Sequence, residues 1–190
     1  MMEIFVTRHG QTDWNIIEKL QGQTDIELND VGRQQAEETG KLIKDEKIDL
    51  IITSPLKRAK ETAEIINKNF NVTIIEDERL MERNFGKSEG LTKSTIRKMK
   101  ENNPEMNDIW DYNKNIDFNG METMHDLCNR IYECLDDVIK RYKGKNILLV
   151  THGGASVPIR YYLMNEPLEN LVDRNNIKRL NNCEVIKFKI

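Results

Sequence analysis

The strongest constraint on the fold is a series of short apolar runs separated by longer stretches in which apolar residues recur at helical spacing. The runs predict strands at residues 4–6, 47–53, 72–75, 146–151 and 183–189. The longer stretches predict helices at residues 31–45, 56–69, 88–101 and 121–142, and a further helix that ends at Leu163. Strands that alternate with helices form a mostly parallel sheet covered on both faces. The 190 residues therefore predict one α/β domain, a three-layer sandwich with helices on both faces of a central sheet.

Residues with acid–base or anion-binding side chains follow four of these strands. In chain order the strands are followed by Arg8-His9-Gly10, by Ser54 and Arg58, by Glu82, and by Thr151-His152-Gly153. The carboxyl ends of parallel strands meet at one edge of a sheet, and ligands of open α/β folds bind at that edge. We therefore expect two imidazoles, two guanidiniums and one carboxylate to gather there.

This group of side chains suits phosphoryl transfer. Two arginines and a histidine can neutralise the non-bridging oxygens as charge redistributes in the transition state. The other imidazole can attack phosphorus through one nitrogen if a carbonyl acceptor holds the second nitrogen as an N–H. Glu82 can donate a proton to the departing oxygen, provided that it is protonated near neutral pH, and can later activate water.

At these residues the chain resembles the histidine phosphatase superfamily, the phosphoglycerate-mutase-like proteins. The resemblance lies in five segments that occur in family order over nearly the whole chain: Arg8-His9-Gly10-x-Thr12-x-x-Asn15, Ser54-Pro55-Leu56-x-Arg58-Ala59-x-x-Thr62, Leu80-x-Glu82-x-x-Phe85-Gly86-x-x-Glu89-Gly90, a looser Gly120-Met121-Glu122-Thr123, and Thr151-His152-Gly153-Gly154. The first is similar to the family signature around a phosphorylated histidine.

The resemblance implies a role for each matching residue. His9 is expected to accept the phosphoryl group and Glu82 to donate the proton. The expected phosphate pocket consists of Arg8, Arg58 and His152, with auxiliary contacts from Asn15, Gln21, Gly22 and the backbone N–H of Gly153. No metal or organic cofactor is implied, and no residue spacing in the sequence is typical of metal ligands.

Departures from the mutase pattern favour hydrolysis over mutase chemistry. Arg83 and Lys93 match positions that mutases of the family use for substrate, and Arg83 is a candidate for holding a second phosphate or a carboxylate. However, Ile109-Trp110 lies about where mutases carry an adjacent arginine pair, and Gly154 stands where mutases typically have Asn. We predict a metal-independent phosphomonoesterase for a small phosphorylated metabolite. The alternatives are a cofactor-dependent phosphoglycerate mutase and a non-catalytic phospho-ligand binding protein.

Residues 88–120 are the predicted lid or specificity segment. The helix at its start carries Lys93, Arg97, Lys98 and Lys100, most simply a solvated face. Residues 102–120 lack periodicity, and a loop of this length in a compact domain is usually functional or mobile. The segment predicts either a lid over the substrate or a plain surface loop.

Net charge and cysteine spacing bear on the partners and the cellular location of the protein. A net charge of −3 argues against a nucleic-acid partner. The three cysteines, Cys128, Cys134 and Cys183, have no metal-type spacing and are expected to be core thiols. With no signal segment or membrane-length apolar run at hand, we expect no membrane association and a cytoplasmic location. The sequence carries no signal for an oligomeric state.

Overall fold

The computed structural model describes residues 2–172 and 179–190. Over these residues the strands are β1 (Glu3–Arg8), β2 (Leu50–Thr53), β3 (Ile74–Glu76), β4 (Ile147–Thr151) and β5 (Val185–Lys189). The α-helices are α1 (Asp13–Ile16), α2 (Asp30–Leu42), α3 (Lys57–Asn67), α4 (Lys93–Asn102), α5 (Met124–Arg141) and α6 (Ser156–Leu163).

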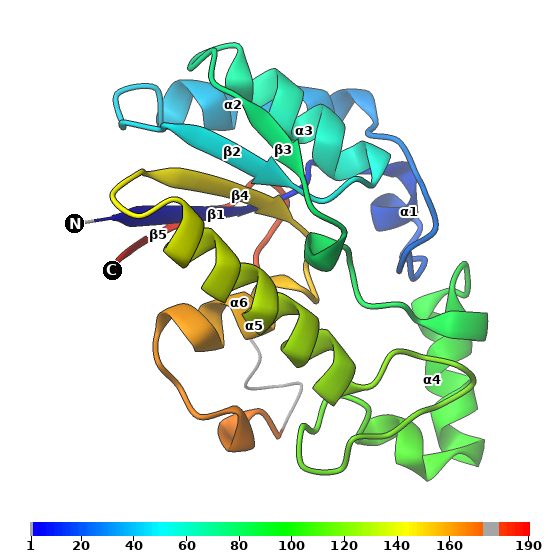
Figure 1. The fold of residues 1–190 in the computed structure, drawn as a ribbon. Helices are drawn as coiled ribbons and strands as arrows, with labels where there is room; N and C mark the ends of the chain where they lie inside the picture. The colour runs from blue at the N-terminus through cyan, green and yellow to red at the C-terminus, as the bar shows by residue number, and fades with distance from the viewer. Residues whose placement is uncertain (1, 173–178) are drawn as a thin grey trace.

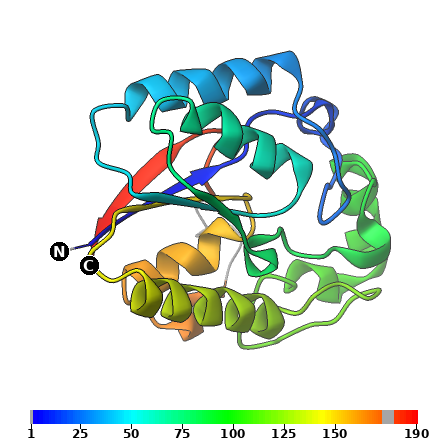
Figure 2. The same cartoon turned by 45° about the horizontal axis from the view of Figure 1, so that its top comes forward.

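The strands form a single mixed sheet in the order β3-β2-β4-β1-β5 (Figure 1). β1 and β4 are parallel neighbours, with Arg8 opposite Thr151, so the residues that follow these two strands lie side by side. Only β5 runs antiparallel, paired with β1 at the sheet edge. Figure 2 shows α2 and α3 on one face of the sheet and α5 and α6 on the other. This confirms the predicted three-layer α/β sandwich with a mostly parallel sheet.

Alternating side chains of the strands fill the two cores, because successive residues of a strand point to opposite faces. Phe5 of β1 packs with α3 residues such as Ala59 and Ala63. Its neighbours Ile4 and Val6 pack in the larger core, with α5 residues such as Leu127. At the carboxyl ends of β1 and β4, buried polar residues such as His9 and His152 replace the apolar ones.

The 102–120 segment does not stand away from the molecule. Met106, Ile109, Trp110 and Phe118 are buried in the same core cluster as α5. The segment lies beyond the carboxyl ends of the strands, next to α4 (Figure 1). It is therefore packed, and whether it closes over a substrate stays a prediction.

The helix predicted from residue 88 begins later, at Lys93 of α4. Gly90 has a positive φ of 78°, which breaks the helix before that point. The hydroxyl of Thr92 then accepts the N–H of Thr95 and caps α4. The short helix α1 was not among the predicted elements. Thr12 and Asn15 form a capping box around it, and its four residues are too few for a periodic signal.

The three cysteines are buried and unpaired, as expected of core thiols. Burial raises the pKa of the Cys128 thiol to about 12. In the part of the chain that the structure describes, no helix is long and apolar enough to cross a membrane.

Candidate active site

His9 lies at the carboxyl end of β1 with one ring nitrogen engaged. Its Nδ1 is 2.7 Å from the carbonyl oxygen of Gly10. A carbonyl oxygen can only accept, so Nδ1 carries the proton and the neutral ring keeps its lone pair on Nε2. Burial lowers the pKa of His9 well below its usual value, and the charges of Arg58 and Arg8 lower it further. Near pH 7 the ring is therefore neutral and Nε2 is available as a nucleophile.

The glycine that holds this ring is itself fixed by close packing. A Cβ on Gly10 would lie 2.4 Å from the carbonyl oxygen of Gly32, in the first turn of α2. The N–H of Gly10 donates to the Thr62 hydroxyl at 3.0 Å. α2 and α3 therefore set the position of the carbonyl that orients His9.

Two guanidiniums lie beside His9, both in the wall of the same cavity, of which Arg58 is buried and Arg8 half-buried. Arg58, on α3, donates to the carbonyls of Gly22 at 2.6 Å and Thr24 at 2.9 Å. Arg8 donates to the carbonyl of Leu180 at 3.1 Å. Burial lowers the pKa of Arg58 to about 10, so it still carries its charge at neutral pH.

His152, which follows β4, is the second imidazole of the group. The centroid of its ring lies 5.2 Å from that of His9. Its Nε2 is 2.8 Å from the Ser54 hydroxyl, which follows β2. Burial lowers the pKa of His152 well below its usual value, with the charge of Arg58 the next cause. The two histidines that the sequence placed at separate strand ends are therefore adjacent and both neutral.

Glu82 is held by backbone N–H groups from two parts of the chain. Its Oε1 accepts from Arg83 at 2.8 Å and from Ala155 at 3.0 Å, and its Oε2 accepts from Gly154 at 2.9 Å. The last two donors lie in the turn between His152 and α6. A Cβ on Gly154 would lie 2.4 Å from Oε1, so the missing side chain makes room for this carboxylate.

Arg8, His9, Arg58 and Glu82 line a cavity of about 630 Å³, within the range typical of small-molecule sites. His152, predicted as part of the phosphate pocket, is fully buried behind His9 and does not itself line this cavity. Arg8 Nε, Arg58 Nε, Gln21 Oε1 and Ser88 Oγ belong to lining residues, are buried and have no hydrogen-bond partner within the described residues. Buried polar atoms are nearly always paired, so this concentration marks a place that a polar ligand completes. The described residues contain no group of three or more His, Cys, Asp or Glu side chains placed to hold a metal ion.

The other predicted contact residues also reach the cavity. Asn15, Gln21, Gly22, Gly153 and Lys93 all line it. The side-chain oxygen of Asn15 accepts the N–H of Thr12 at 3.0 Å, so this residue also shapes the loop after β1. Lys93 forms an ion pair with Glu18 at 2.7 Å. It lies on the part of the cavity lining that α4 forms, which we call the outer wall. Trp14, a candidate for the lip of the pocket, lines the cavity as well.

Arg83, the other specificity candidate, points elsewhere. It is fully buried and does not line the cavity. Its Nε donates to the carbonyl of Glu122 at 2.7 Å and its Nη1 to that of Ile109 at 2.6 Å. Its guanidinium also lies 4.8 Å from the centroid of the Trp110 ring. In this structure Arg83 therefore anchors residues 109–122 and does not face the cavity, unlike a residue that holds a second phosphate or a carboxylate there.

Replacing Arg83 with methionine is expected to lower the free energy of unfolding by about 3 kcal/mol, because two carbonyls lose a buried charged donor. Chemical denaturation measures this. Lys93→Met is the control, since its ion pair with Glu18 is exposed to solvent and contributes little to stability. An unchanged stability together with a raised KM for Arg83→Met would contradict the structural role.

Glu89 is a supporting residue to which the sequence assigned no role, although it stands in the third motif. Its carboxylate accepts from the N–H groups of Gln23, Thr24 and Phe85 at 2.9, 2.9 and 3.0 Å. It also accepts from the Thr24 hydroxyl at 2.6 Å. The same loop supplies the two carbonyls that hold Arg58, so Glu89 positions this guanidinium through the loop.

Replacing Glu89 with glutamine turns one acceptor oxygen into a donor that faces N–H groups. We expect the loop to shift and kcat/KM to fall about 100-fold, the loss typical of a misplacement near 1 Å. Steady-state kinetics measure kcat/KM, and inhibition by inorganic phosphate measures the affinity for phosphate. We expect kcat/KM and this affinity to fall together. Glu27→Gln, an exposed carboxylate paired with Lys57, is the matched control and should change neither.

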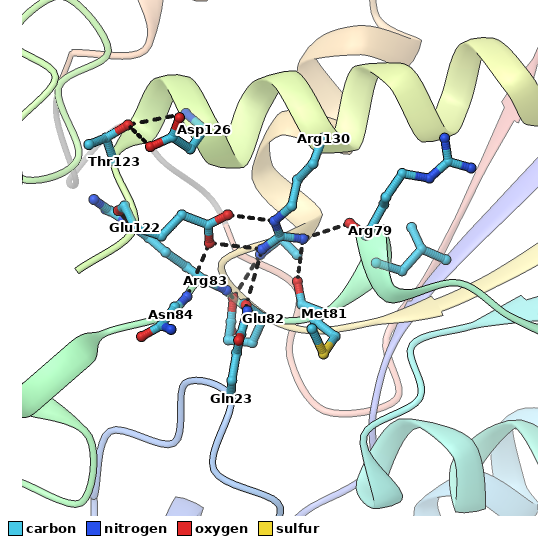
Figure 3. A network of polar contacts seen from close by, with 12 residues as sticks. Gln23, Arg79, Met81, Glu82, Arg83, Asn84, Glu122, Thr123, Asp126 and Arg130 are labelled. Carbon is cyan, nitrogen blue, oxygen red and sulfur yellow. Dashed lines mark hydrogen bonds and ion pairs between the residues drawn. The ribbon is translucent and has the colours of Figure 1, made fainter. Parts of the chain in front are cut away.

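Arg130 of α5 is the residue that sequence reasoning missed entirely. Figure 3 shows its guanidinium reaching from the helix to the chain around Glu82. It donates to the carbonyls of Arg79, Met81 and Glu82 at 2.6, 2.9 and 3.1 Å. Its other contacts are to the carboxylate of Glu122, at 2.5 and 2.9 Å. No local pattern marks such a residue, because all but one of its partners lie about 50 positions earlier.

The fold and these contacts define a class of protein: an α/β sandwich with a cavity at the carboxyl edge of its sheet, in whose wall a neutral imidazole lies beside two guanidiniums. The chain belongs to the histidine phosphatase superfamily (branch 1), whose family model matches residues 4–190. This confirms the family resemblance drawn from the sequence.

Individual relatives share most of the chain. The Bacillus subtilis (strain 168) protein named uncharacterized phosphatase PhoE is 42% identical over 155 residues, which cover 82% of this chain and 74% of that protein. A metal-independent phosphoserine phosphatase of Arabidopsis thaliana is 36% identical over 157 residues, covering 80% and 65%. Among solved structures, Bacillus stearothermophilus YhfR superimposes with a TM-score of 0.88 at 29% identity, covering 100% of this chain and 92% of that one.

Proposed function

We propose that this protein is a phosphomonoesterase that hydrolyses a small phosphorylated metabolite through a phosphohistidine intermediate, without a metal ion. The observation that carries the proposal is the 2.7 Å contact between His9 Nδ1 and the Gly10 carbonyl, which leaves the lone pair of Nε2 available in a cavity that Arg8 and Arg58 also line. Relatives named as phosphatases support the same reading.

In the first half-reaction, His9 Nε2 attacks phosphorus and the bond from phosphorus to the ester oxygen breaks. Arg8 and Arg58 stabilise the negative charge on the non-bridging oxygens. The proton on the carboxyl group of Glu82 passes to the departing oxygen, which leaves as an alcohol. A phosphoryl group then resides on Nε2, and Glu82 is a carboxylate.

In the second half-reaction, water attacks the phosphoryl group. Glu82 takes a proton from that water as its oxygen bonds to phosphorus, and the bond from phosphorus to Nε2 breaks. Inorganic phosphate leaves, and both His9 and Glu82 return to their starting states. The backbone donors on the Glu82 oxygens hold the carboxyl group in one orientation through both steps.

Two features of the cavity favour water over a sugar-acid hydroxyl as the second acceptor. Ile109 and Trp110 give an apolar wall where mutases of the family carry an arginine pair. Gly154 gives no side chain to hold a second substrate group, and its N–H is occupied by Glu82. A mutase must bind its acceptor tightly, so we place mutase activity second.

Phosphate release from a panel of phosphorylated sugars, sugar acids, amino acids and nucleotides, in excess chelator, tests the proposal. We expect release by the unmodified protein and none by His9→Ala. Absence of release across the panel from a folded protein would contradict phosphatase function, and interconversion of 2- and 3-phosphoglycerate would then identify a mutase. Activity that disappears with chelator and returns with a divalent ion would contradict the metal-independent mechanism.

A further inference from the structure

One stripe of α4 faces the cavity. The helix residues that line it are Lys93, Ile96, Arg97 and Lys100, which follow the three- and four-residue spacing of one helix face. Ser94, Thr95 and Lys98 do not line it and are exposed. At 1.5 Å of rise per residue, the stripe extends about 10 Å along the outer wall. Ile96 of this stripe packs against the core, and the three cations flank it at the edge of the cavity, where Lys93 and Arg97 are also exposed to solvent.

The cavity is positively charged although the chain has a net charge of −3. Seven of its lining residues are lysine or arginine, and two, Glu18 and Glu82, are carboxylates. Arg8 and Arg58 serve the phosphate site, so most of the remaining positive charge lies on the outer wall. Glu18 pairs with Lys93 there. A cleft lined by one sign of charge concentrates ligands of the opposite sign.

The same cavity also has apolar lining residues. Ile96, Met106 and Ile109 line it, and Met106 and Ile109 are buried in the core cluster. A ligand that spans the cavity would therefore meet both cations and apolar side chains.

We propose that the substrate is an elongated phosphate ester that carries a second anionic group, a carboxylate or a further phosphate, which Arg97 binds on α4. The proposal rests on the phosphatase function proposed above. Arg97 is chosen because a planar guanidinium pairs with either group through two parallel hydrogen bonds. The carbon skeleton between the two anions packs on Ile96. Arg97 thus determines specificity, and it takes no part in the transfer of the phosphoryl group.

A matched pair of esters tests this. One is the phosphate ester of 3-(4-hydroxyphenyl)propanoate, and the other is the corresponding propanamide, which has nearly the same shape and leaving group but lacks the second charge. We expect kcat/KM to be about tenfold or more higher for the acid, as a charged hydrogen bond provides. Arg97→Gln should remove the preference, with a larger loss of kcat/KM on the acid than on the amide. Lys98→Gln, on a side of the same helix that does not line the cavity, should keep the preference.

The outcomes separate the two proposals. Equal hydrolysis of the acid and the amide by the unmodified protein would overturn the second-anion site and leave the phosphatase function standing. A preference that survives in Arg97→Gln would overturn the assignment to Arg97. If another ester of the panel is cleaved but neither of this pair, the two are compared as competitive inhibitors, and equal inhibition constants overturn the proposal. Absence of any hydrolysis across the whole panel contradicts the phosphatase function itself.

Discussion

Replacing His9 with alanine is expected to lower kcat/KM by about 10⁴-fold or more, the loss typical of removing a covalent nucleophile. Without Nε2 there is no acceptor for the phosphoryl group, and water would have to attack the ester directly. The fold should survive, because the ring borders an existing cavity and its removal enlarges that cavity without opening a void in the core. Phosphate release and chemical denaturation measure the two effects separately.

The intermediate itself can be detected. Rapid quenching of the unmodified protein in alkali should trap a phosphoryl group that mild acid releases, the behaviour of a phosphorus–nitrogen bond, and His9→Ala should trap none. His125→Ala is the matched control, because that ring stacks on Tyr112 with a centroid separation of 4.3 Å and does not line the cavity. Turnover within tenfold of normal in His9→Ala would refute the covalent mechanism.

The sequence was informative where function depends on residues at strand ends. The sequence placed Arg8-His9 and His152 at strand ends on one edge of the sheet. They meet because β1 and β4 are parallel neighbours, an order that the apolar runs alone did not predict. Ser54 and Arg58 follow β2, the other neighbour of β4. Such positions are set by strand order, and the motifs at their ends mark them.

Arg83 shows where that reasoning ends. Glu82 and Arg83 are adjacent, but the first accepts from the turn before α6 and the second donates to residues 109–122. Neighbouring residues of an irregular, extended stretch point apart, and nothing local says which one faces the cavity. The burial of the 102–120 segment could not be predicted either. Met106 and Trp110 are buried although they lie outside regular α-helices and strands, and in such backbone the buried positions do not recur at a fixed spacing.

The second large effect is expected at Gly154, whose N–H donates to the Glu82 side chain. A substitution there tests Glu82 as the proton donor without changing Glu82 itself. The backbone of Gly154 does not have the positive φ that alanine resists, but a Cβ there would lie 2.4 Å from Glu82 Oε1 and 3.1 Å from Trp110 Cη2. In Gly154→Ala the carboxyl group must therefore leave its backbone donors. We expect kcat/KM for an alkyl phosphate to fall by about 10²- to 10³-fold, the usual contribution of a general acid.

The leaving group distinguishes lost proton donation from general damage. 4-Nitrophenolate departs without a proton, so kcat/KM for 4-nitrophenyl phosphate should fall by less than about tenfold in Gly154→Ala. Glu82→Gln should show the same contrast. Gly153→Ala should lose less on the alkyl ester, because its Cβ would meet the Arg8 guanidinium at 3.4 Å, near ordinary contact. Equal losses of Gly154→Ala on both esters would mean that its alanine disturbs the phosphate pocket as a whole. The general acid would then have to be sought among other groups of the cavity.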